Sequence, residues 1–242
     1  MTARIERVVT SGVVDIDGTE HKVENNTWIV GDDDEVIVID PARDAEKIME
    51  KVGEREVLAV ICTHGLPDHV GAAIEVAARD EAMVCLHPKD KKIWRETWPE
   101  TWPDIEVEDE GFFEVAGVRL EVLETPGITP GGISLYCEAL DVVFTGKSLQ
   151  ADGPGKIGGV YPALPDQLTS IGSRLFTLPG ATRILPNHGE EATIGDLEPH
   201  FDDWVSGSLT RKEDESEADP AKAAPLVDGT KVAGIKLSLD DD

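Results

Sequence analysis

Short apolar runs alternate along most of the chain with polar or glycine-containing segments, a pattern typical of buried strands separated by turns. The run VLAVICTH at 57–64 is continuously apolar until its last two residues, so we expect a buried central strand there. Residues 112–127 should form a hairpin that turns at Ala116-Gly117, and GDDDE at 31–35 should connect a second hairpin. The strands expected from this pattern cover residues 7–16, 26–31, 35–41, 57–64, 83–88, 112–127, 131–147 and 183–189.

Helical spacing of apolar residues occurs between these strands. In the segment 69–80, Val70, Ile74 and Ala77 share one face, and Asp68 is placed to cap the start of the helix. Further helices are expected at 44–52, 91–96, 165–178 and about 196–207. The strands fall into two batches, and each batch is followed by helices. This order predicts an α/β fold of four layers, in which two sheets face each other between outer helices, an αββα sandwich.

The composition changes near residue 208. The segment RKEDESEADPAKAAP is highly charged and contains Ala and Pro without apolar periodicity, so it should be disordered. The last residues, VAGIKLSLDDD, alternate briefly and fit either an added edge strand or a frayed end, and we favour the frayed end. The predicted organisation is therefore one domain over residues 1–207 and an acidic tail over residues 208–242.

Charge and cysteine content limit the classes of function. The formal net charge is -27, from 49 acidic and 22 basic side chains, so the chain should repel nucleic-acid phosphates and anionic membrane surfaces. The 3 cysteines are dispersed and form no CxxC pair, which indicates buried thiols in a reducing compartment. The first residues, MTARIERVV, contain no apolar run of the kind found in a signal peptide, so we expect none. We therefore expect a cytoplasmic protein that binds neither nucleic acid nor membrane.

Four polar loops each follow a predicted strand: THGLPDH at 63–69, TPGITPG at 125–131, FTGKS at 144–148 and PNHG at 186–189. Any one of them alone is an ordinary turn or a surface histidine. Hydrolytic metal sites, however, are built from His and carboxylate side chains that converge from such strand-end loops. The ordered set of four is therefore the informative feature.

This ordered set resembles the metallo-β-lactamase superfamily, in particular its glyoxalase II-like hydrolases, over roughly residues 1–207. That family carries T-H-x-H-x-D-H, T-P-G-H-T-P-G, F-T-G-D and a G-H-G-type loop. The resemblance implies the αββα fold, a cleft at the sandwich edge that takes a small molecule, and a supporting role for Asp40 behind the histidine loop. It also implies ligand roles for His64, Asp68, His69 and His188.

Three of the family's seven ligand positions hold other residues here. Leu66 and Ile128 stand where the family has histidines, and Lys147 stands where it has the aspartate that bridges two metals. An ammonium in place of that carboxylate would repel a metal by roughly 4 kcal/mol at about 4 Å and an effective dielectric near 20. Lys147 should instead form an ion pair with Asp68. The substitutions therefore predict a site rebuilt without its dinuclear centre.

Three hypotheses for the function follow. The first is a metal-free protein that binds a small molecule or a partner in the old cleft and has lost the family's hydrolysis. The second is a hydrolase with one Zn or Fe ion on Asp68, His69 and His188. The third is a metal-independent hydrolase or lyase, with His64 or His69 as general base and Lys147 stabilising an oxyanion or acting as nucleophile.

Residues beyond the four loops are candidates to line the cleft. Lys156 and Tyr161 lie in the glycine-rich segment GPGKIGGVY, which borders the substrate cleft in the family that the chain resembles. Trp98, in the near-duplication RETWPETWP, fits either an aromatic wall of the cleft or a loop anchored by its indoles. His87 at a strand end fits either a cleft residue or an ordinary loop residue.

Deletion of residues 208–242 should leave the melting temperature unchanged, because a charged segment without periodicity contributes no packed contacts. Thermal unfolding of the full chain and of the deletion variant, followed by circular dichroism, checks this. A large drop in melting temperature would show that VAGIKLSL docks on the domain as a strand.

Overall fold

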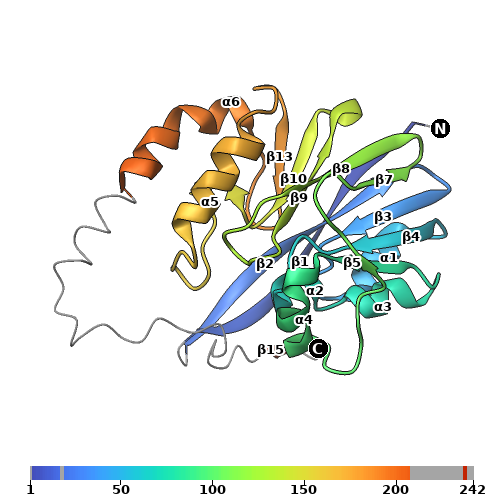
Figure 1. Ribbon diagram of the computed structural model, residues 1–242. Helices are drawn as coiled ribbons and strands as arrows, with labels where there is room; N and C mark the ends of the chain where they lie inside the picture. Colours follow the sequence, from blue (N-terminus) through green and yellow to red (C-terminus); the bar gives the residue numbers. More distant parts are fainter. Residues whose placement is uncertain (1, 17–18, 208–236, 239–242) are drawn as a thin grey trace.

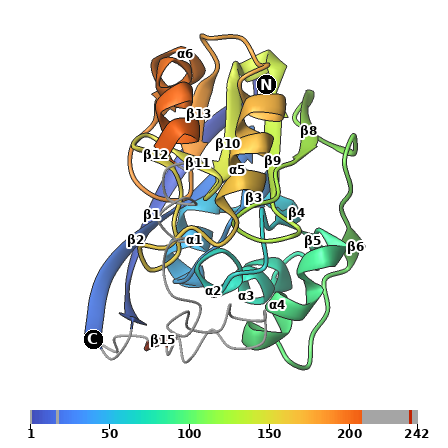
Figure 2. The same ribbon diagram turned by 60° about the vertical axis from the view of Figure 1, so that its left-hand side comes forward.

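The computed structural model describes residues 2–16, 19–207 and 237–238, and its two sheets stack face to face with helices outside them (Figures 1 and 2). The first sheet has seven strands in the order β15-β1-β2-β3-β4-β5-β6. The long β1–β2 hairpin extends beyond the sandwich as an arm (Figure 1). These strands are β1 (Arg4–Ile16), β2 (Thr19–Gly31), β3 (Glu35–Ile39), β4 (Glu56–Ile61), β5 (Met83–Leu86), β6 (Ile105–Glu106) and β15 (Leu237–Ser238).

The second sheet has six strands in the order β14-β13-β10-β9-β8-β7, and a small two-stranded ribbon, β11-β12, lies apart from it. Ala116 and Gly117 both have positive φ at the turn between β7 and β8, which confirms the predicted hairpin. These strands are β7 (Phe112–Val115), β8 (Val118–Glu124), β9 (Ile133–Cys137), β10 (Val142–Gly146), β11 (Leu149–Gln150), β12 (Gly153–Pro154), β13 (Arg183–Pro186) and β14 (Ala192–Thr193).

Helices cover the outer face of each sheet, α1 to α4 on the first and α5 and α6 on the second (Figure 1). The α-helices are α1 (Ala45–Val52), α2 (Pro67–Val70), α3 (Ala73–Ala78), α4 (Lys91–Thr97), α5 (Leu164–Ser170) and α6 (Ile194–Leu197). Residues 201–207 are also helical, and a π-turn over Ile171–Leu175 continues α5. Together with the two sheets, these helices form the αββα sandwich that the sequence predicts.

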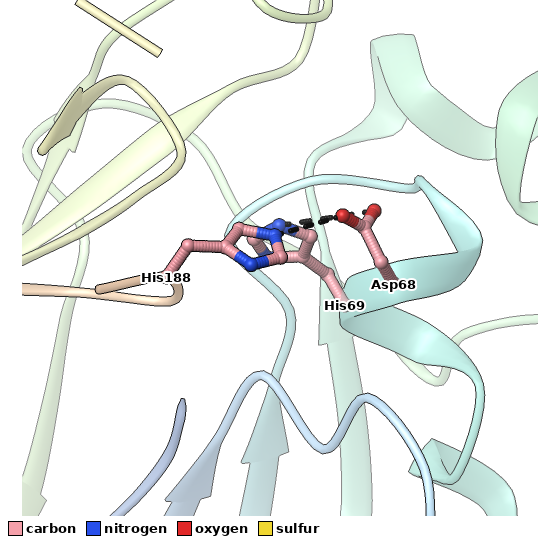
Figure 3. Close-up of side chains that lie close together, drawn as sticks. All are labelled: Asp68, His69 and His188. Carbon is pink, nitrogen blue, oxygen red and sulfur yellow. Dashed lines mark hydrogen bonds and ion pairs between the residues drawn. The ribbon is translucent and has the colours of Figure 1, made fainter. Parts of the chain in front are cut away.

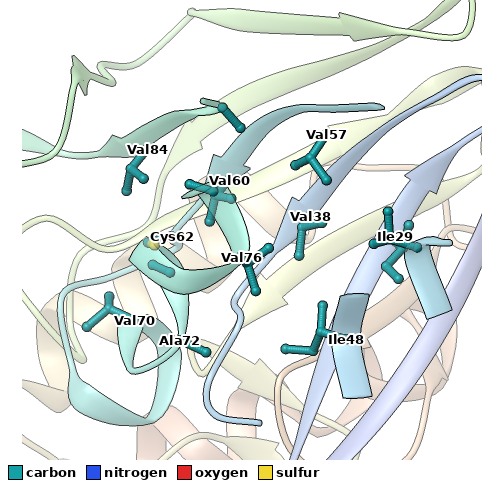
Figure 4. Close-up of a cluster of buried hydrophobic side chains, with 14 of the residues drawn as sticks. Ile29, Val38, Ile48, Val57, Val60, Cys62, Val70, Ala72, Val76 and Val84 are labelled. Carbon is teal, nitrogen blue, oxygen red and sulfur yellow. The ribbon is translucent and has the colours of Figure 1, made fainter. Parts of the chain in front are cut away.

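Three apolar layers hold the sandwich together. Successive residues of a strand belong to different layers, because their side chains point to opposite faces of the sheet. Trp28 and Ile37 face the second sheet, whereas their neighbours Ile29 and Val38 face α1 and α3, because successive strand residues point to opposite faces (Figure 4). The outer layer under α5 and α6 includes Ile184. Each central strand is therefore buried on both sides, which explains its nearly continuous apolar sequence.

The helix predicted over 69–80 is broken into α2 and α3, and the prediction that Asp68 caps it is wrong. A Cβ at Gly71 would lie 2.3 Å from the carbonyl oxygen of Ala42, so the chain packs directly on that backbone. The backbone amide of Ala72 donates to the carbonyl of Pro41 at 2.9 Å. This amide therefore does not make the hydrogen bond that a continuous helix would need. The residue before α2 is Leu66, and Asp68 lies inside the short helix. Its carboxylate is therefore free to face another element.

Residues 237–238 form strand β15, which pairs antiparallel with β1 at Val13 and Val14. The preference for a frayed end is therefore wrong for these two residues, which form the added edge strand that the alternation also allowed. The rest of the predicted tail lies outside the described residues, so the division at residue 207 stays a prediction. Among the described residues, no helix is both long enough and apolar enough to cross a membrane.

Candidate functional site

The candidate site lies at the edge of the sandwich where β3, β4, β10 and β13 end. β3 and β4 run parallel in one sheet, and β10 and β13 run parallel in the other, so each pair brings its carboxyl ends to one edge. The four loops predicted from the sequence follow β4, β8, β10 and β13. Side chains of three of these loops, Asp68, Lys147 and His188, contact one another, and the fourth loop is tied to the histidine loop through Asp90.

Asp90 fastens two of these loops to each other. Its buried carboxylate accepts hydrogen bonds from the Gly65 amide at 2.9 Å, the Gly131 amide at 2.7 Å and the Thr129 hydroxyl at 2.6 Å. Burial raises the pKa of Asp90, and these three donors oppose the rise. The loop that carries His64 and the loop that carries Ile128 are thus held in a defined relation by one carboxylate.

Thr63 joins the histidine loop to the loop of Lys147. A Cβ at Gly146 would lie 2.2 Å from Thr63 Oγ1, and Gly146 has φ +53°, so only glycine permits this approach without strain. The Thr63 amide and hydroxyl donate to Asp40 at 2.7 and 2.8 Å. Burial raises the pKa of Asp40 to about 6, although a neighbouring histidine and the Thr63 donors act in the opposite direction. Asp40 therefore holds the start of the histidine loop through Thr63, and its supporting role in the site stays a prediction.

The hydrogen bonds define which nitrogen of each histidine is left without a partner. Because Thr63 gives its hydroxyl proton to Asp40, it accepts from Nδ1 of His64 at 2.9 Å, and Nδ1 of His69 donates to Asp40 at 2.9 Å. Both rings are buried and lie 3.6 Å apart between centroids, and their Nε2 atoms have no hydrogen-bond partner. Burial lowers the pKa of each well below its ordinary value, so both imidazoles are neutral. Their Nε2 atoms therefore present lone pairs.

Asp68 is the centre of charge in the site (Figure 3). Its Oδ2 atom lies 2.5 Å from Lys147 Nζ. The same atom lies 3.0 Å from Nε2 of His188, and Oδ1 lies 3.9 Å from Nε2 of His69. The His188 ring is oriented by its Nδ1, which lies 2.9 Å from the carbonyl oxygen of Glu24. Burial alone would raise the pKa of Asp68, but Lys147 and the histidines hold it well below its ordinary value. The expected Lys147–Asp68 ion pair is thus formed.

The residues do not fit a dinuclear centre. The two apolar replacements, Leu66 and Ile128, are 7% and 4% exposed and offer no ligand atom. Lys147 presents a positive charge to the only carboxylate of the cluster. A single ion fits better, because ligand atoms of Asp68, His69 and His188 all lie within 4.8 Å of one another. The buried, unpartnered Nε2 of His69 is the kind of atom a metal would satisfy, and Asp40 orients that ring from behind.

The loop after β12 lies against Lys147. A Cβ at Gly155 would be 1.9 Å from the carbonyl oxygen of Lys147, and Gln167 donates to the carbonyls of Ser148 and Gly155 at 2.8 and 3.1 Å. Lys156, the next residue, places its ammonium 4.9 Å from the centre of the Tyr161 ring. The segment of these two candidates therefore lies next to the site, and their role in lining it stays a prediction.

The other two candidate lining residues use their polar atoms within the fold. His87 is buried, its Nε2 lies 2.9 Å from Glu124, and its Nδ1 accepts from the Lys89 amide at 3.2 Å. The indole N–H of Trp98 donates to the carbonyl of Val70 at 2.8 Å, and its ring packs against the apolar layer under the helices. These contacts are those of residues that anchor loops.

Sequence reasoning missed the asparagines that position the site. Asn25 Nδ2 donates to the carbonyl of Asp68 at 3.0 Å and to Oδ1 of Asn187 at 2.9 Å, and it lies 3.3 Å from Nε2 of His188. The backbone amide of Asn187 also donates to the carbonyl of Gly146 at 2.8 Å. The polar pair NN at 25–26, just before the apolar run WIV at 28–30, was the available signal.

Comparison with known proteins agrees with this geometry. The family model of the metallo-beta-lactamase superfamily matches residues 22–213, and the chain belongs to this superfamily. It is 32% identical over 189 residues to the probable metallo-hydrolase YqgX of Bacillus subtilis, covering 71% of this chain and 88% of that protein. It is 30% identical over 207 residues to a hydroxyacylglutathione hydrolase of Ectopseudomonas mendocina, covering 81% of this chain and 75% of that protein. A solved structure, TTHA1623 in a di-iron-bound form, superposes with a TM-score of 0.61 at 26% identity and covers 73% and 93% of the two chains.

Replacing Lys147 with methionine should lower the free energy of unfolding by about 3 kcal/mol, because it keeps the side-chain volume but leaves a buried carboxylate without its cation. Lys147 and Asp68 are only 12% and 17% exposed, so solvent does not replace the lost partner. Urea unfolding measures the change. The matched control is Lys156→Met on the exposed loop, which should change stability by less than about 0.5 kcal/mol. Equal stabilities for the two variants would contradict the role of the ion pair.

Proposed function

We propose that this chain is a metallo-β-lactamase-fold protein that has exchanged the dinuclear hydrolytic centre for a small-molecule binding site, with Lys147 as the cation of that site. The observation that carries this proposal is the 2.5 Å contact between Lys147 Nζ and Asp68 Oδ2. In a metal site the Asp68 carboxylate would compensate the charge of the metal, whereas here its own charge is compensated by the Lys147 ammonium. The protein would then be a binding pseudoenzyme.

The charge balance supports this proposal. Burying an ionised carboxylate costs several kcal/mol unless a cation compensates it, and Lys147 supplies that cation permanently. The buried apolar side chains of Leu66 and Ile128 contribute volume in place of histidine ligands. The residues at the three positions are consistent with one another. Leu66 and Ile128 lack ligand atoms, and Lys147 supplies a positive charge in place of a metal ion.

The chemistry of a ligand follows from the groups that the site presents. The neutral imidazoles of His64 and His69 offer acceptors at Nε2, and the Lys147 ammonium has donors beyond the one that Asp68 accepts. A small polar molecule with a hydroxyl or amide donor and a carbonyl or carboxylate oxygen would satisfy both. The segment with Lys156 and Tyr161 would form one wall of this site.

A second candidate function is hydrolysis with a single metal ion, and the unpartnered Nε2 of His69 within the Asp68–His69–His188 cluster favours it. A bound Zn or Fe ion would supply a Lewis acid and an activated water for attack on a thioester or ester. In that case Asp68, His69 and His188 would hold the ion, Asp40 would orient His69, and Lys147 would have to leave Asp68.

Zinc titration by calorimetry distinguishes the two functions. The wild-type protein should show no tight zinc binding, because the Lys147 ammonium opposes a dication at Asp68. The triple variant Leu66→His, Ile128→His, Lys147→Asp should bind zinc, since it returns the family's full ligand set. Hydrolysis of an S-hydroxyacylglutathione thioester is measured in parallel, with zinc added.

Tight zinc binding by the wild type together with thioester hydrolysis would overturn the binding-protein proposal and support the one-metal hydrolase. The single variant Lys147→Met is the matched control, because it removes the ammonium without adding a ligand. If this variant binds zinc and the wild type does not, the ammonium itself is what excludes the metal.

A further inference from the structure

Two buried arginines lie against the same face of β1 and differ in their partners. Arg55 is 7% exposed, and its guanidinium donates to Glu6 at 2.5 Å and to the backbone carbonyls of Val52, Lys51 and Asp32. Arg43, which follows β3, is 8% exposed, yet its Nη1 and Nη2 atoms are buried without any hydrogen-bond partner. A buried guanidinium is normally paired, so Arg43 is the exception that needs an explanation.

The position of Arg43 is created by a glycine. A Cβ on Gly12 would lie 2.1 Å from Arg43 Nη1 and 2.8 Å from Arg43 Cζ, so the guanidinium rests directly on the backbone of β1. Side chains alternate along a strand, and Glu6 and Gly12 are therefore on one face. On this face Arg55 contacts the carboxylate of Glu6, whereas Arg43 contacts only the backbone of Gly12.

Two further buried polar atoms face the same side of the arm without partners. Thr10 precedes Gly12 on this face and pairs in register with Asn25 of β2. Thr10 Oγ1 and Asn25 Oδ1 are both buried and lack a hydrogen-bond partner. The orientation of the Asn25 amide is defined, because its Nδ2 atom already donates to Asp68 and Asn187. The guanidinium has more N–H donors than one amide oxygen can accept.

Arg43 also lacks an ion-pair partner among the described residues. Asp68 is the carboxylate whose charge acts on Arg43, but no ion pair within 4.0 Å joins the two among the described residues, and Asp68 already contacts Lys147 and His188. Burial of the guanidinium lowers the pKa of Arg43. A cation enclosed in this way is stabilised by an anion that brings its own charge into the pocket.

We propose that Arg43 and Thr10, beneath the β1–β2 hairpin, form a site for a small monovalent anion, either a halide or the carboxylate of a small acid. The guanidinium donates from Nη1 and Nη2, and the Thr10 hydroxyl donates a further hydrogen bond. Gly12 is required because any side chain there displaces the guanidinium. This site uses different side chains from the Asp68 cluster, although the charge of Asp68 acts on Arg43.

Chloride NMR line broadening tests the proposal on the full chain. The wild type should broaden the chloride signal, and this broadening should be lost in Arg43→Met and in Gly12→Ala. Arg119→Met is the matched control, since Arg119 is an arginine that is half exposed on a strand, and its removal changes the net charge equally. The control should broaden the signal as the wild type does. A wild-type signal no broader than that of Arg43→Met overturns the proposal.

Competition and crystallography complete the test. Formate that removes the broadening at concentrations below that of chloride identifies a carboxylate site, whereas chloride that resists formate identifies a halide site. Should neither variant fold, crystals of the wild type soaked in bromide give the answer by anomalous scattering. A bromide peak against Nη1 or Nη2 of Arg43 supports the proposal. Ordered water there, or an ion pair of Arg43 with Asp68, overturns it.

Discussion

The buried carboxylate of Asp68 sets the constraint on which the site depends. Asp68 lies at the sandwich edge inside the short helix α2, and solvent reaches only 17% of its side chain. Such a charge must be compensated by a cation, whether a metal ion or an ammonium. In this chain Lys147 meets that requirement from the opposite sheet, so the ion pair also joins the two halves of the sandwich.

Several contacts hold the loops around Asp68 in place. Asp90 fastens the loops of Gly65 and Gly131 through backbone amides, and Gly146 brings the Lys147 loop against Thr63. These contacts involve glycines and a carboxylate outside the ligand set. The loops are therefore fixed at points that do not involve the ligand positions.

The sequence predicted the sandwich, most strands and the meeting of the four loops, because strand periodicity and strand-end motifs are local signals. The resemblance to the superfamily also predicted the Lys147–Asp68 pair, since it places both residues at ligand positions of one site. The sequence did not predict features that depend on contacts between distant segments of the chain. The break before α3 depends on the backbone of Pro41 and Ala42, which lies in a distant segment. The buried roles of Asn25, Asp90 and Arg43 likewise depend on residues far away in the chain.

The most direct test of the central claim, that Lys147 takes the place of metal in this site, is the metal content of the protein. The protein is purified without chelator, and its zinc and iron are measured by elemental mass spectrometry against protein concentration. The account predicts far less than one metal ion per chain. One equivalent of zinc or iron that is lost on substitution of His69 or His188 would contradict it.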